Sequence, residues 1–195
     1  MPRAIVLAGA LAAGLALYFA LSLYVLPQAF QEVEEPPKPL PVVTAVNISS
    51  QQIALGDTLR IHLEGANAGD AADMQIISAG FPNLTGTGDI EILRHDFRQT
   101  PFMIRPGDDV SANYEGVASA VAQYPSVEGY SMPWEGGSAY SMELQVKPQS
   151  EGRFVIFVKS VALPHTWDGA HYPRGGLLDY QREYVEFYSV QVTKS

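Results

Sequence analysis

Two histidines and a carboxylate follow one another at three-residue spacing in the last quarter of the chain. His165, Asp168 and His171 lie in the segment Pro164–Gly176. Neutral imidazole and carboxylate groups are suitable ligands for Zn, Cu or Ni, so this segment is a candidate metal site. The alternative is that neighbouring aromatic residues anchor the segment while both histidines remain surface donors. The chain has no cysteine, which excludes a thiolate metal site, and we find no motif for another cofactor.

Aromatic side chains form a second candidate site. They stand in or beside predicted loops, and aromatic residues are enriched at recognition surfaces. The candidate partner-binding residues are Tyr130, Trp134, Trp167, Tyr172 and Tyr180. The alternative is that these rings pack their own loops onto the body of the protein.

Catalysis has weaker support in the sequence. Glu135, Asp168 and Asp179 flank glycine-rich loops, and a glycosidase needs two such carboxylates beside a cleft. The sequence does not place them near one another, and it contains no Gly-x-Ser-x-Gly turn to present a nucleophile. We therefore predict a protein that is not an enzyme and keep a carbohydrate-binding or carbohydrate-active sandwich as an alternative.

The elements that must position these residues are strands. Apolar and polar residues alternate along Leu59–Glu64 and Tyr140–Lys147, as in strands with one buried face. Gly, Pro, Asn and Asp separate these from further candidate strands. Those are Val42–Ile48, Met74–Ala79, Ile90–Leu93, Phe102–Ile104, Val110–Tyr114, Arg153–Val161 and Tyr184–Val192. The pattern predicts an all-β, antiparallel sandwich with long loops at 115–138 and 162–182.

The strands Arg153–Val161 and Tyr184–Val192 are apolar on both faces. A strand of an open sandwich normally has a polar outer face, so we expect something to cover this one. The favoured cover is the chain itself, through residues 115–138. The alternative cover is a protein partner.

The chain begins with a hydrophobic segment. Residues 4–26 are uncharged and mostly apolar, and a helix of that length rises about 34 Å, enough to cross a hydrocarbon core of about 30 Å. Arg3 precedes the segment and all acidic residues follow it, which predicts a cytoplasmic N-terminus. A cleaved signal peptide is the alternative, but the apolar run is long and Pro27-Gln28-Ala29 is a poor cleavage site.

These observations predict three parts. Residues 1–30 form a cytoplasmic stub and a single transmembrane helix, and residues 31–41 form a proline-rich acidic linker. Residues 42–195 form the extracytoplasmic sandwich, at the cell surface or in the periplasm of a prokaryote. The net charge of −9 makes nucleic acid a poor partner.

Two motifs give the chain a resemblance to a known family. Gly56-Asp57-Thr58-Leu59 leads to the polar turn Asn67-Ala68-Gly69, and Pro148-Gln149-Ser150-Glu151-Gly152-Arg153-Phe154 precedes a late strand. In these motifs the chain resembles the immunoglobulin-like sandwiches of prokaryotic surface proteins, of the type called CARDB. The resemblance implies an immunoglobulin-like fold.

Our favoured functional hypothesis is a noncatalytic, membrane-anchored immunoglobulin-like domain that binds a protein partner in a membrane or surface assembly. The alternatives are a metal-binding or metal-delivery domain that uses His165, Asp168 and His171, and a carbohydrate-binding sandwich.

Overall fold

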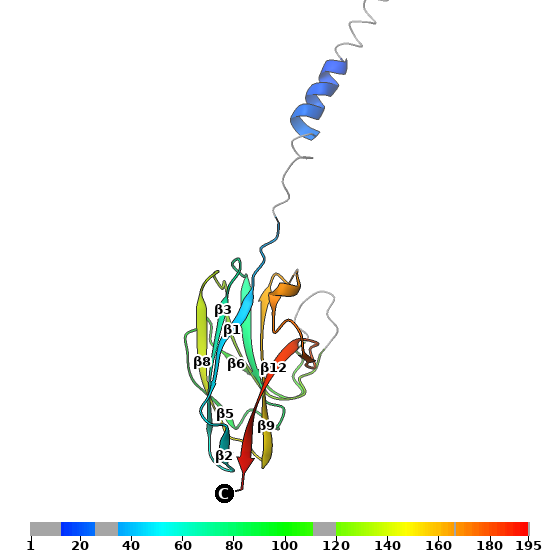
Figure 1. The fold of residues 1–195 in the computed structure, drawn as a ribbon. Coiled ribbons are helices and arrows are strands. Elements are labelled where there is room, and N and C mark those ends of the chain that lie inside the picture. Colours follow the sequence, from blue (N-terminus) through cyan, green and yellow to red (C-terminus); the bar gives the residue numbers. More distant parts are fainter. Residues whose placement is uncertain (1–12, 26–34, 111–119, 166, 195) are drawn as a thin grey trace, which may run out of the picture. The chain divides into compact units, whose positions relative to one another are not determined.

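The structure is a computed structural model that describes residues 13–25, 35–110, 120–165 and 167–194. The chain divides into two compact units, Met1–Glu35 and Pro36–Ser195. The larger unit is built of strands (Figure 1).

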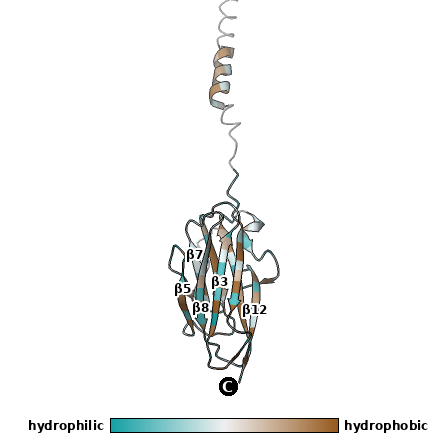
Figure 2. Cartoon of the chain, turned by 60° about the vertical axis from the view of Figure 1, so that its left-hand side comes forward, coloured by the Kyte–Doolittle hydropathy of each residue, from teal (hydrophilic) through white to brown (hydrophobic). Residues whose placement is uncertain are grey.

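In the first unit, residues 13–20 form an α-helix that continues as the π-helical turn η1 (Leu21–Val25). Figure 2 shows that this segment is mostly hydrophobic. The rest of the predicted span, residues 4–12 and 26, lies outside the described residues. Within the part that is described, no helix is both long and apolar enough to cross a membrane. The transmembrane helix therefore stays a prediction.

The second unit has two sheets. The smaller sheet has the order β1 (Pro41–Ile48), β3 (Leu59–Asn67), β8 (Ala139–Val146), β5 (Ile90–His95). The larger sheet has the order β11 (Leu177–Leu178), β12 (Tyr184–Thr193), β9 (Gly152–Leu163), β4 (Met74–Gly80), β7 (Ser126–Ser131), β6 (Phe102–Ile104). In addition, β10 (His171–Tyr172) pairs with β9, and β2 (Gln52–Ala54) pairs with β12. All pairings are antiparallel except that between β2 and β12. The predicted antiparallel sandwich is confirmed.

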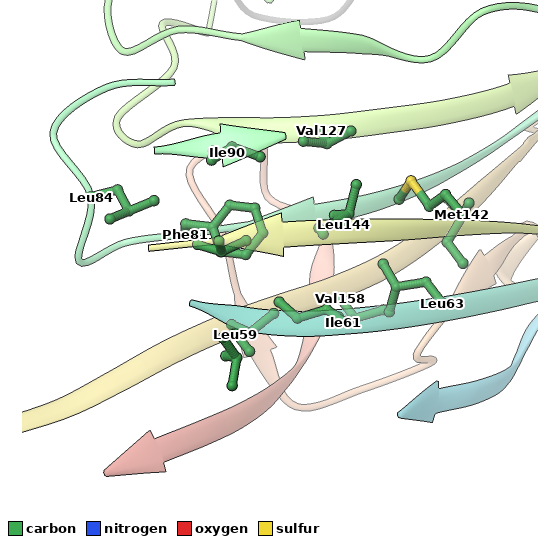
Figure 3. Close-up of a cluster of buried hydrophobic side chains, with 14 of the residues drawn as sticks. Leu59, Ile61, Leu63, Phe81, Leu84, Ile90, Val127, Met142, Leu144 and Val158 are labelled. Carbon is green, nitrogen blue, oxygen red and sulfur yellow. The ribbon is translucent and has the colours of Figure 1, made fainter. Parts of the chain in front are cut away.

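The core lies between the two sheets, where side chains from their inner faces meet (Figure 3). Leu59, Ile61 and Leu63 of β3 are fully buried, and Arg60, His62 and Glu64, which alternate with them, are not. Figure 2 shows this alternation of hydrophobic and hydrophilic residues along the strands. The period of two read from the sequence therefore identified the inner face of β3 correctly.

The outer face of β9 is covered in part by the chain itself. Tyr124 packs edge-on against Phe157 and against Tyr180, with ring centroids 5.6 Å and 4.9 Å apart. Tyr124 belongs to the predicted covering segment 115–138, so the self-cover interpretation is confirmed at this point.

Three sequence predictions need correction. Strand β7 lies inside the predicted loop 115–138; its residues are buried on both faces, so they do not alternate. The predicted loop 162–182 contains β10, β11 and the 3-10 helix η2 (Asp168–Ala170). The predicted linker ends earlier than expected, because the Lys38 and Leu40 N–H groups donate to Asp70 and Asn67 of the sandwich. The predicted strand Val110–Tyr114 lies almost wholly outside the described residues.

Candidate metal centre

Three strands bring the candidate ligands together. His165 follows β9, and His171 begins β10, which folds back to pair with β9 through His171–Val161 and Tyr172–Ser160. Glu183 directly precedes β12, which is the neighbour of β9 in the larger sheet. The end of β9, the start of β10 and the start of β12 therefore meet at one place.

The ligand atoms of His165, His171 and Glu183 all lie within 4.8 Å of one another. The two Nε2 atoms are in direct contact. The centroids of the two imidazole rings are 3.9 Å apart, and the interplanar angle is 66°. His171 Nδ1 lies 2.6 Å from Glu183 Oε2 and 3.3 Å from His165 Nε2. We assign the proton of this contact to His171 Nδ1, because an ionised carboxylate can only accept. This tautomer leaves the Nε2 lone pair facing His165.

The protonation states suit metal binding. Burial, together with the charge of His171, lowers the pKa of His165, so its imidazole is neutral at neutral pH. Burial by itself would raise the pKa of Glu183, but the hydrogen bond from His171 and the attraction of positive charge on His171, on Lys159 and, when it is protonated, on His165 lower this pKa below its ordinary value. The centre thus combines a neutral imidazole with an ionised carboxylate, the forms that bind metal ions.

Aromatic anchors hold the segment between the two histidines. Trp167 Nε1 donates to the Pro39 carbonyl at 3.1 Å, and a Cβ atom on Gly169 would overlap the Trp167 ring. Tyr172, next to His171, donates its hydroxyl proton to Glu186 at 2.8 Å. Burial, followed by this hydrogen bond, raises the pKa of Tyr172 to about 12. Both rings therefore stabilise the fold of the segment.

The structure brings together two of the three predicted metal ligands. Asp168 is exposed at the start of η2, and it does not belong to the cluster. Glu183 takes the place of the carboxylate and was missed by sequence reasoning. The signal available was its position directly before the predicted strand Tyr184–Val192.

The candidate partner-binding aromatics are separate in the structure. Trp134 is fully buried against Phe97 and Tyr140, so its assignment to a partner surface is wrong. Tyr130 lies on β7 with its ring edge-on to Phe102. Trp167, Tyr172 and Tyr180 are half-buried and make the internal contacts described above. Trp134 packs into the core between the two sheets. The alternating pattern in the sequence does not reach this residue, so its burial was not predicted.

The candidate glycosidase carboxylates have other contacts. Asp179 is buried in an ion pair with Lys159, and Glu135 lies 3.9 Å from Arg98. Asp168 is exposed on η2.

No family model matches the sequence, and no curated protein matches it. Similar solved structures include the CARDB domain of a Pyrococcus furiosus protein in complex with di-metal ions, at 8% identity and a TM-score of 0.37. That match covers 84% of this chain and 94% of the other. A Clostridium perfringens cohesin module matches at 9% identity and a TM-score of 0.37, covering 82% of this chain and all of the module.

A β-glucosidase from Erythrobacter marinus matches at 13% identity and a TM-score of 0.38. The match covers 80% of this chain, which spans only 16% of the glucosidase. At these identities the three likenesses are generic to β-sandwich folds, and they say nothing about the function of this chain.

Proposed function

We propose that this chain is a membrane-tethered, extracytoplasmic β-sandwich that binds a transition-metal ion through His165 and His171. The single observation that supports the proposal is the convergence of both Nε2 atoms beside a carboxylate that is hydrogen-bonded to His171. Glu183 then acts as the outer-shell carboxylate that fixes the tautomer and the orientation of His171.

The donor set selects the class of metal. Two imidazole nitrogens suit copper, zinc or nickel, whereas calcium and magnesium require several oxygen ligands. Cu(II) binds such sites more tightly than Zn(II) in the general affinity order of divalent ions. His165 is exposed, so an ion bound here stays open to water and to exchange with another molecule. This arrangement fits metal binding for delivery better than a closed structural site.

The tether is supported by the character of the first unit. Large apolar side chains of its helix are exposed; they are Leu15, Leu17, Tyr18, Phe19, Leu21, Leu23 and Tyr24. A lipid environment would bury them. With Arg3 as the only basic side chain before this segment, the sandwich and its metal centre lie outside the cytoplasm.

Calorimetric titration of the full-length chain with Cu(II) and Zn(II) tests the metal site. We expect one ion per chain and tighter binding of Cu(II). His171→Ala removes a ligand and should abolish this binding, whereas Glu183→Gln should weaken it about 10–100-fold. His62→Ala is the matched control, because His62 lies on β3 and outside the cluster. Equal affinities of His171→Ala and His62→Ala would end the proposal.

Binding of a protein partner is the second candidate function, because Leu177, Leu178, Tyr184 and Phe187 expose 38–53% of their surface on β11 and β12. The partner we expect is another protein of the same membrane assembly. Leu177→Lys combined with Leu178→Lys should dissociate that assembly in native membranes. An assembly of unchanged mass would exclude this surface.

A further inference from the structure

A buried ion pair next to the candidate metal centre joins β9 to the turn that precedes β12. Lys159 Nζ on β9 lies 2.5 Å from Asp179 Oδ2, and the two side chains are only 10% and 2% exposed. The same ammonium group donates to Gln181 Oε1 at 2.5 Å. A buried pair of this kind contributes little net stability, because both charges lose their hydration. Its position therefore suggests a role other than holding the sandwich together.

Asp179 organises the turn that leads to Glu183. Its Oδ1 accepts the backbone N–H groups of Gln181 at 2.8 Å and of Glu183 at 3.0 Å. Its own N–H donates to the Glu183 carbonyl at 2.9 Å, and its carbonyl accepts from Arg182 N–H at 3.1 Å. Arg182 has a φ of 64°, in the left-handed region that costs energy for a residue with a side chain. The hydrogen bonds that Asp179 makes to residues 181–183 stabilise the turn in this conformation.

Lys159 connects the turn to the sheet. It is part of β9, and β10 pairs with β9 through His171. Strand β9 therefore holds His171 through β10, and it holds the turn that leads to Glu183 through Lys159. Tyr124 packs on Tyr180 within the turn and on Phe157 of β9, so its ring also connects the turn to β9. The buried Glu128 also lies near Lys159, and burial raises the pKa of Glu128.

We propose that the Lys159–Asp179 ion pair is a positioning element of the metal centre. It holds the 179–183 turn so that Glu183 accepts the Nδ1 proton of His171 and leaves His171 Nε2 for the metal ion. This inference rests on the proposed metal site, but the hydrogen bond between His171 and Glu183 exists without metal and can be measured by itself.

The test compares full-length Lys159→Met and Lys159→Arg with wild type. Nitrogen-detected NMR of the metal-free chain reports the tautomer of His171, and calorimetry reports the affinity for Cu(II). We expect Lys159→Met to lose the Nδ1–H tautomer and to bind Cu(II) about 10–100-fold more weakly, the usual cost of a lost outer-shell contact. Lys159→Arg keeps the pair and should behave as wild type. Arg94→Met is the matched control, because it removes the exposed ion pair with Glu143.

A folded Lys159→Met chain with the wild-type tautomer and affinity would overturn the inference. If Lys159→Met does not fold, Asp179→Asn replaces it, since the amide has nearly the same volume and lacks the charge; the same two readouts then decide. Failure of wild type to bind Cu(II) would refute the metal site, whereas the tautomer would still report whether the ion pair positions Glu183.

Discussion

Replacement of Trp134 by alanine tests the most direct correction that the structure makes to the sequence interpretation. The Trp134 side chain is fully buried, and its ring packs edge-on to Tyr140 with centroids 4.8 Å apart. Its Nε1 donates to the Ser138 carbonyl at 3.1 Å, and its backbone exchanges two hydrogen bonds with Ala72. The side chain therefore belongs to the core.

The magnitude follows from this burial. Truncation of a fully buried Trp to Ala costs about 3–5 kcal/mol, which includes the cavity left behind. The backbone hydrogen bonds to Ala72 survive the change, so the loss is confined to the ring and its N–H. With a urea m-value of about 2 kcal/mol/M for a domain of this size, the unfolding midpoint should fall by about 2 M.

Urea unfolding of the full-length chain, followed by circular dichroism, measures this shift. Trp167→Ala is the control, because that ring is half-buried and makes one hydrogen bond to Pro39. We expect it to cost about 1–2 kcal/mol. A loss below about 1.5 kcal/mol for Trp134→Ala would refute the buried placement, and the partner-binding interpretation of this residue would return.

Two further predictions concern Glu128, which lies near the Lys159–Asp179 ion pair, and Gly169, which lies between the two histidines of the candidate metal centre. Burial raises the pKa of Glu128, with a smaller contribution from Asp179 and against the attraction of Lys159. The folded state therefore binds the Glu128 proton more tightly than the unfolded state does. Protonated Glu128 contributes to stability in full below the unfolded pKa of about 4.3, and this contribution is lost as the pH rises through the pKa of the folded state. Glu128→Gln should thus gain stability over wild type as the pH rises, and parallel urea midpoints across pH would contradict this. A Cβ on Gly169 would displace the Trp167 ring, so Gly169→Ala should weaken Cu(II) binding about tenfold. Gly175→Ala is the control and should not weaken it, because there is open space around Gly175. Equal calorimetric affinities of the two variants would refute the anchoring role of Trp167.

The fold was predictable where one face of a strand is buried and the other is wet. The alternation along β3 and β8 identified both strands and their inner faces. Strand β7 was missed because it is buried on both sides and contains Glu128 and Gly129, residues that are uncommon in strands. Gly129 stands there because the Phe97 ring occupies the space of its Cβ. A contact of this kind, between residues distant in sequence, leaves no local pattern.

The site was predictable as a region and not as a set of ligands. The density of histidine and carboxylate residues identified His165 and His171, but equal spacing along the chain suggested Asp168 as their partner. The 3-10 turn η2 takes Asp168 out of the cluster. Glu183 joins the cluster only because β10 folds back on β9 and the Asp179 turn precedes β12. These pairings depend on tertiary structure.

Strand β9 has two halves with different tasks, and this separates stability from metal binding. Its first half places Phe154, Ile156 and Val158 in the core, whereas its second half contains Lys159 and the residues that pair with β10. A core variant such as Ile156→Ala should therefore lower the unfolding midpoint while the folded fraction keeps its affinity for Cu(II). A Lys159→Met variant also loses stability, because Asp179 is left buried without its partner, but its folded fraction should bind Cu(II) more weakly, because the position of Glu183 changes. If both kinds of variant lost affinity in proportion to stability, the metal centre would be a consequence of the intact core, and no separate positioning by the ion pair would be needed.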